Sequence, residues 1–134
     1  MVSKYLLDTN ILIRFLTNDS EKQATAVENL FQKAPDKSLV VPDVILVETV
    51  FVLLSFYDLS KEAIIEKISA MIAYSKFDLH KALFQKTLAL YSKYPISFVD
   101  AYLGAVSSSK PTRPVFTFDK KMLGLTEIKA VEPG

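Results

Sequence analysis

The chain has 134 residues, enough for one compact domain, and a formal net charge of +1, which gives no global attraction to nucleic acid. Any RNA or DNA binding would therefore need a local cluster of Lys and Arg. The absence of cysteine excludes disulfides and thiolate metal sites and suits a reducing cytoplasm, so a metal would be held by oxygen or by His80. Half of the residues are hydrophobic, which predicts apolar surface for a partner or a second copy.

Two apolar segments imitate membrane signals. The N-terminal run is interrupted by Asp8, Asn10 and Arg14 before a signal-peptide core can form. Residues 39–57 approach transmembrane length, but two acidic residues within them would each cost about 2.5–3.5 kcal/mol near a bilayer centre. We therefore expect a buried helix there and no membrane association.

The first half of the chain begins with a short strand over residues 3–7, followed by a helix that starts near Asn10. Residues 20–33 open with the capping box SEKQ and continue as an amphipathic helix. A second strand is expected at 38–41, and then a helix at 43–56 that is apolar nearly all round.

The second half begins with two amphipathic helices, at residues 60–74 and about 80–92. Small and apolar residues at 96–109 predict another helix, followed by a strand over 113–119 and a final edge strand over 127–133. A single helical turn is expected between those two strands.

Strands that alternate with helices predict an α/β fold of three layers, α/β/α, with a mostly parallel sheet of four to five strands. We expect one domain over residues 1–134. Ligands of such sheets sit beyond the carboxyl ends of the strands, and both Asp8 and Asp119 follow a predicted strand.

Four carboxylates conflict with a purely structural interpretation. Asp8 adjoins an apolar run, Glu48 is the only charge in the apolar segment around it, and Asp100 has mainly apolar helical neighbours. Buried carboxylates are costly unless they are paired, protonated or metal-bound. If these three met Asp119, each pair at about 5 Å would repel by roughly 3 kcal/mol at an effective dielectric of about 20. Oxygen ligands suit Mg²⁺ or Mn²⁺, which can activate water and stabilise a phosphate under attack.

Each acid also has a structural alternative. Asp8 could cap the helix near Asn10, and Asp119 could cap the turn that follows it. Glu48 and Asp100 could form buried salt bridges with a lysine or arginine of another helix.

The motifs LLDTN, VETV, SFVDAYLGA and VFTFDKKM, in this order, resemble the PIN-domain family and within it the VapC-type ribonuclease toxins. The resemblance spans almost the whole chain. It implies a PIN-like fold and a metal-dependent endoribonuclease that uses Mg²⁺ or Mn²⁺ and leaves 5′-phosphate and 3′-hydroxyl ends. Its catalytic and metal-binding residues carry over to Asp8, Glu48, Asp100 and Asp119.

The resemblance also assigns supporting roles and shows one departure. Asn10 matches a position that steadies the site, and Thr117 matches a hydroxyl position near metal or substrate. Many family members carry a further acid after the fourth, whereas this chain has Lys120 and Lys121, which puts a second metal ion in doubt. These lysines, or Arg14, are alternative phosphate contacts.

The resemblance further implies a homodimer that binds an antitoxin through apolar helix faces, for which we single out residues 20–33 and 60–74. The competing interpretation is a catalytically silent PIN-like module that only binds RNA or a protein. A mechanism with two histidines is excluded because His80 is the only one. A haloacid-dehalogenase-like phosphatase would need an aspartate at Asn10, and a receiver domain would need paired acids after the first strand, so both fit worse.

Overall fold

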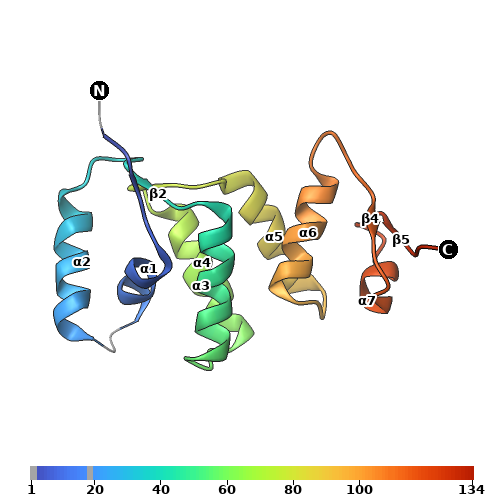
Figure 1. Ribbon diagram of the computed structural model, residues 1–134, viewed down its shortest axis with the longest axis horizontal. Coiled ribbons are helices and arrows are strands. Elements are labelled where there is room, and N and C mark those ends of the chain that lie inside the picture. Colours follow the sequence, from blue (N-terminus) through green and yellow to red (C-terminus); the bar gives the residue numbers. More distant parts are fainter. Residues whose placement is uncertain (1–2, 18–19) are drawn as a thin grey trace. The chain divides into compact units, whose positions relative to one another are not determined.

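The protein is described here by a computed structural model, in which residues 3–17 and 20–134 are placed. Over these ranges the chain forms seven helices and five two-residue strands (Figure 1). It divides into two compact units, Met1–His80 and Lys81–Gly134, which are described separately.

The first unit is a parallel sheet with four helices. Its elements are β1 (Tyr5–Leu6), α1 (Thr9–Leu16), α2 (Glu21–Lys33), β2 (Leu39–Val40), α3 (Asp43–Ser55), α4 (Lys61–Ala73) and β3 (Phe77–Asp78). The sheet has the order β1–β2–β3, with Leu39 opposite both Tyr5 and Phe77. Strand β3 was not expected from the sequence. The segment around it, SKFDLH, has no apolar run like those at the predicted strands, and pairing with β2 defines it.

Packed aromatic rings hold the helices of the first unit against its sheet. The ring of Phe15 lies 4.9 Å from that of Phe31, and the ring of Phe77 meets Phe31 edge-on at 5.5 Å and Tyr74 at 4.9 Å. Phe31 and Phe77 are almost fully buried. Burial also raises the pKa of Tyr74. These rings pack α1 and α2 against each other and against β3.

The apolar face of α4 is part of this core. Ile64, Ile68 and Met71 are fully buried, and Ile72 nearly so. The expectation that residues 60–74 offer an apolar face to a partner is therefore wrong, because the unit covers that face itself. On α2, Val27 and Phe31 are buried and Leu30 is exposed.

The second unit joins two packed helices to a small parallel sheet. Its elements are α5 (Lys81–Lys93), α6 (Phe98–Ser108), β4 (Val115–Phe116), α7 (Lys120–Leu123) and β5 (Ala130–Val131). Strands β4 and β5 pair in parallel, with Val115 opposite Ala130. The backbone of α6 approaches the chain before β5 closely at Gly104, where an added Cβ would lie 2.4 Å from Cδ1 of Ile128.

The predicted α/β class with parallel strands is confirmed. The single sheet of four to five strands is not: the described residues form a three-stranded sheet in the first unit and a separate two-stranded sheet in the second. The segment that imitated a membrane span forms the 13-residue helix α3 instead. Within residues 3–17 and 20–134, none of the helices combines the length and apolar character needed to cross a membrane. The single domain expected over residues 1–134 stays a prediction.

Candidate metal-binding carboxylates

Asp8 lies at the carboxyl end of β1 and caps α1. Its Oδ1 accepts a hydrogen bond of 3.1 Å from the backbone N–H of Ile11. The side chain is exposed, although its apolar neighbours predicted burial. Strand β1 explains this difference, because Tyr5 and Leu6 are 66% and 76% exposed and only Leu7 is buried. The capping role and a metal-binding role are compatible, since the cap bond uses one carboxylate oxygen.

Glu48 lies in the middle of α3 and is held from α1. The hydroxyl of Thr9 donates a hydrogen bond to Oε1 of Glu48. Glu48 is exposed, and its helical neighbours Val44 and Phe51 are 70% and 61% exposed. The apolar segment around Glu48 predicted that its side chain is buried. That was wrong because α3 buries another face, formed by Leu46, Thr49, Val50 and Leu53.

Asp8 and Glu48 are thus connected through one residue. Thr9 follows Asp8 in the chain and bonds to Glu48, so the two carboxylates are set by adjacent positions at the start of α1. Sequence analysis did not single out Thr9. The available signal was a hydroxyl residue directly after an acid at a strand end.

A cavity of about 410 Å³ adjoins Asp8 between α1 and α2. It is lined by Asp8, Asn10, Ile11, Arg14, Gln23, Ala26 and Val27. The Arg14 guanidinium is oriented there by a 2.6 Å hydrogen bond from Nε to Oε1 of Gln23 and by a 3.4 Å contact with the Tyr57 hydroxyl. Asn10 therefore lies beside Asp8 on an open, mixed polar and apolar surface.

In the second unit, Asp100 occupies the first turn of α6. The hydroxyl of Ser97 caps this helix by accepting a 3.1 Å hydrogen bond from the Asp100 N–H. Because α6 begins at Phe98, Ile96 lies outside the helix and is not the helical neighbour of Asp100 that the sequence suggested. Asp100 is half-buried, and Val99 beside it is 55% exposed.

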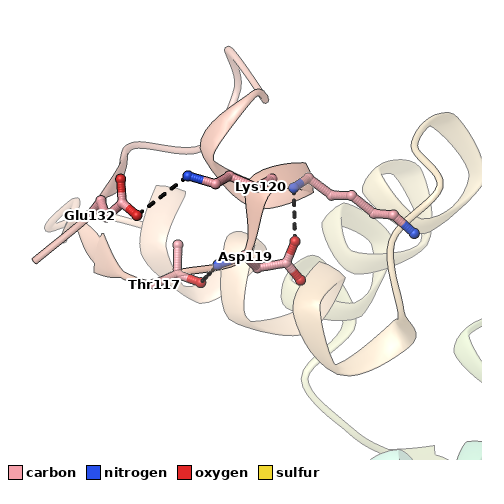
Figure 2. Close-up of polar contacts among 5 residues, drawn as sticks. Thr117, Asp119, Lys120 and Glu132 are labelled. Atoms are coloured by element: carbon pink, nitrogen blue, oxygen red, sulfur yellow. Dashed lines mark hydrogen bonds and ion pairs between the residues drawn. The ribbon is translucent and has the colours of Figure 1, made fainter.

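Asp119 follows β4 and caps α7, which confirms the capping role considered as the structural alternative to metal binding. Its Oδ1 accepts a 2.8 Å hydrogen bond from the Lys121 N–H, and its own N–H donates to Thr117 Oγ1 at 3.0 Å (Figure 2). Lys120 forms a 3.4 Å ion pair with Glu132, also drawn in Figure 2. Thr117 therefore sets the backbone of Asp119, and Lys120 is engaged within the unit.

The buried salt bridges considered for Glu48 and Asp100 do not occur: no described lysine or arginine pairs with either, and neither is fully buried. Among the placed residues, no group of three or more Asp, Glu, His or Cys side chains is arranged to hold a metal ion. The structure brings Glu48 to Thr9, the residue after Asp8, and it places Asp100 and Asp119 in the other unit. A common site for all four stays a prediction.

Comparisons with known sequences and structures find proteins that are similar to this chain. The chain is 28% identical over 132 residues to a VapC ribonuclease of Aquifex aeolicus, covering 95% of this chain and 97% of that protein. Among solved structures, the Mycobacterium tuberculosis toxin VapC20, which cleaves the sarcin–ricin loop, has 18% identity and a TM-score of 0.43 over 92% of this chain and 98% of its own. A toxin–antitoxin complex from Klebsiella pneumoniae gives 19% identity and a TM-score of 0.36, with 98% of each chain covered. The PIN domain family matches residues 5–127, and the chain therefore belongs to the PIN-domain family.

Proposed function

We propose that this protein is a metal-dependent endoribonuclease, the toxin of a toxin–antitoxin pair, acting in the cytoplasm. The observation that carries the proposal is the PIN family match over residues 5–127, which includes all four acids. The similarity to a VapC ribonuclease along 95% of the chain supports the choice of RNA as substrate. We assign catalysis and metal binding to Asp8, Glu48, Asp100 and Asp119.

The chemistry of these side chains fits Mg²⁺ or Mn²⁺. They offer hard oxygen ligands, and the chain contains neither cysteine nor a second histidine. A bound Mg²⁺ or Mn²⁺ would supply Lewis acidity at the phosphate and favour deprotonation of an attacking water.

Hydrogen bonds within the chain orient the carboxylate side chains. Thr9 restricts the rotamers of Glu48, and the cap bond from Ile11 sets the direction of Asp8. Thr117 fixes the backbone of Asp119. Asn10 adjoins Asp8 and is assigned a supporting role. Ordered ligands of this kind lower the entropy lost when an ion and a phosphate bind.

Cleavage of RNA tests the proposal directly. Purified protein should cut RNA in Mg²⁺ or Mn²⁺, stop in EDTA, and leave 5′-phosphate and 3′-hydroxyl ends. Asp8→Asn and Asp100→Asn should abolish cleavage, and the first keeps the helix cap because Asn also caps helices. Asp58→Asn is a matched control, since Asp58 has a positive φ of 53° that Asn tolerates. Cleavage that persists in EDTA or in both site variants would refute the mechanism.

The second candidate function is a catalytically silent module that binds RNA or a protein. One observation favours it: Lys120 and Lys121 stand where many family members have a further acid. Titration with Mn²⁺ by calorimetry separates the two. A silent module should show no Mn²⁺ site, whereas the nuclease should bind Mn²⁺ and lose this binding in Asp8→Asn.

We also propose an antitoxin partner and a homodimer. Exposed apolar side chains support the assignment of an apolar partner surface, and in the first unit they include Leu30 on α2 together with Val44 and Phe51 on α3. A dimer interface of roughly 1,200–2,000 Å² would be ordinary. Sedimentation at micromolar concentration should give twice the mass of 15.0 kDa, and a monomer at every concentration would refute the dimer.

A further inference from the structure

A polar cavity of about 240 Å³ lies at the end of α6 in the second unit, and we name it the basic groove. Its lining includes Ser107, Ser108, Thr112, Arg113, Glu127 and Lys129. Arg113, Lys129 and Thr112 are exposed, whereas Ser107 is buried. The groove thus presents two cations and the exposed hydroxyl of Thr112, none of them assigned to the carboxylate site, whereas the Ser107 and Ser108 hydroxyls bond to backbone carbonyl groups.

The charge of the chain is unevenly divided, which the overall value of +1 conceals. Residues 81–134 contain eight basic residues (Lys and Arg) and four acidic residues (Asp and Glu). Residues 1–80 contain eight basic and eleven acidic residues. The one acid of the groove, Glu127, forms an ion pair with Lys93. The hydrogen bond from Lys93 lowers the pKa of Glu127, so the carboxylate charge is neutralised by the ammonium group of Lys93 on α5. Arg113 and Lys129 are left to define the potential of the groove.

A helix C-terminus is a poor place for an anion unless its carbonyl groups are occupied. At the end of α6 they are. The Ser107 carbonyl accepts a 2.8 Å bond from the Arg113 N–H, and the Ala105 carbonyl accepts from Ser109 N and Oγ. Lys86 Nζ lies 3.5 Å from the Ser108 carbonyl and donates to it.

The same contacts fix the loop that carries the cations. The Arg113 N–H donates to the Ser107 carbonyl, and the Ser107 hydroxyl donates to the Arg113 carbonyl. Both backbone polar groups of Arg113 are therefore hydrogen-bonded to Ser107. Lys129 is positioned from the sheet, because its carbonyl accepts a 2.8 Å bond from Val115 N. Arg113 and Lys129 therefore have defined backbone positions across the groove.

We propose that the basic groove binds the sugar–phosphate backbone of single-stranded RNA. This inference rests on the proposed function, in which the strand is the substrate. Arg, Lys, Ser and Thr are the side chains that contact phosphate and sugar. The described residues that line the groove include no aromatic side chain on which a base could stack, so the contact is independent of sequence. Two exposed cations, neither enclosed in a buried pocket, suit the solvated phosphates of a polyanion better than one small anion.

Equilibrium binding in EDTA tests the groove without cleavage. The probe is a fluorescein-labelled single-stranded RNA of mixed sequence, followed by anisotropy between 50 and 200 mM salt. The double variant Arg113→Gln/Lys129→Gln is compared with Lys22→Gln/Lys33→Gln, which removes two exposed lysines of α2 and the same net charge. Two lost phosphate contacts should reduce the slope of log K against log salt by about 1.4 and weaken binding at low salt by roughly 10- to 50-fold. The control pair should keep the wild-type slope.

Equal slopes and affinities in the two double variants would overturn the inference, as would wild-type protein that binds no RNA. The result is separable from the proposed function. If the groove variant loses RNA binding but no RNA is cut in Mn²⁺, the groove stands and the nuclease proposal fails. If RNA is cut and the groove variant binds like its control, the nuclease stands and the groove fails.

Discussion

Thr9 at the start of α1 donates a hydrogen bond from its hydroxyl to Oε1 of Glu48 in the middle of α3. The exposed Glu48 side chain would otherwise sample several rotamers, because a surface glutamate has little packing to restrict it. The bond places this carboxylate beside the helix start that Asp8 caps. The positions of Asp8 and Glu48, which are far apart in the sequence, therefore both depend on the first turn of α1.

Replacement of this hydroxyl should weaken the site without unfolding the protein. Thr9→Val removes the donor and should reduce Mn²⁺ affinity and RNA cleavage roughly 10- to 100-fold, the usual effect of losing a group that orients a ligand. Thr9→Ser should retain most of both. Thr25→Val on the exposed side of α2 serves as control. Calorimetry and initial cleavage rates measure the effect; wild-type Mn²⁺ affinity in Thr9→Val would show that the bond is dispensable.

A methyl group at Gly104 should destabilise the second unit. In Gly104→Ala the new Cβ would lie 2.4 Å from Cδ1 of Ile128 and 3.2 Å from Cδ1 of Leu90, and Ile128 is only 3% exposed and has little room to move. We expect a loss of about 1–3 kcal/mol in the free energy of unfolding, measured with urea.

The matched rescue is Ile128→Val, which removes the atom nearest to the new methyl group. In the Gly104→Ala background it should recover part of the loss, although alone it should cost about 0.5–1.5 kcal/mol. Strictly additive effects in the double variant would disprove the contact as the cause.

The ion pair of Lys93 and Glu127 predicts a pH dependence of stability. The Lys93 ammonium donates to Glu127, which raises the pKa of Lys93 above 10.5 and lowers that of Glu127 below 4.5; Tyr94 adds to both shifts. A carboxylate with a lowered pKa contributes stability that is present above pH 4.5 and is lost as the pH falls through the lowered value. For Lys93 the contribution is present below pH 10.5 and is lost as the pH rises through the raised value.

Thermal melts of the wild type and Lys93→Gln from pH 2 to 8 test this dependence. The melting temperatures should differ near neutral pH and converge in acid, and added salt should reduce the difference because both groups are exposed. A constant difference at every pH would assign the effect of the substitution to packing instead.

Removal of a central ring should cost the first unit far more than any surface change. Phe77 is fully buried and contacts Phe15, Phe31 and Tyr74. Phe77→Ala should lower the free energy of unfolding by about 3–5 kcal/mol, and Phe77→Leu by less because it leaves a smaller cavity. Urea unfolding followed by circular dichroism measures both, and equal losses in the two variants would argue against a cavity effect.

The sequence predicted the helices well because their apolar periodicity and caps extend over many residues. The helix expected at 43–56 is α3 (Asp43–Ser55), and Ser60 and Asp119 cap helices as their positions suggested. Strand β3 was missed because its segment, SKFDLH, lacks the apolar run that marks the predicted strands. Its existence depends on hydrogen bonds to β2, which are distant in the chain.

Exposure was the least predictable property of the candidate site. Glu48 has apolar helical neighbours, yet an apolar helix can leave one face uncovered, and nothing local in the sequence distinguishes that face. The bond from Thr9 to Glu48 was also beyond prediction, since it joins two helices through tertiary packing. The four acids were proposed because residue type and order carry the family resemblance, and neither depends on exposure.

The aromatic packing of the two units provides separate spectroscopic reporters. The chain has no tryptophan, so its near-ultraviolet signals come from tyrosine and phenylalanine. Tyr74 packs among the rings of the first unit, whereas Tyr91 meets Phe98 edge-on and Tyr102 stacks on Phe84 in the second. Single Tyr→Phe replacements would assign each band to one unit. Near-ultraviolet circular dichroism during heating would then reveal whether the halves of the chain melt in one cooperative transition or in succession.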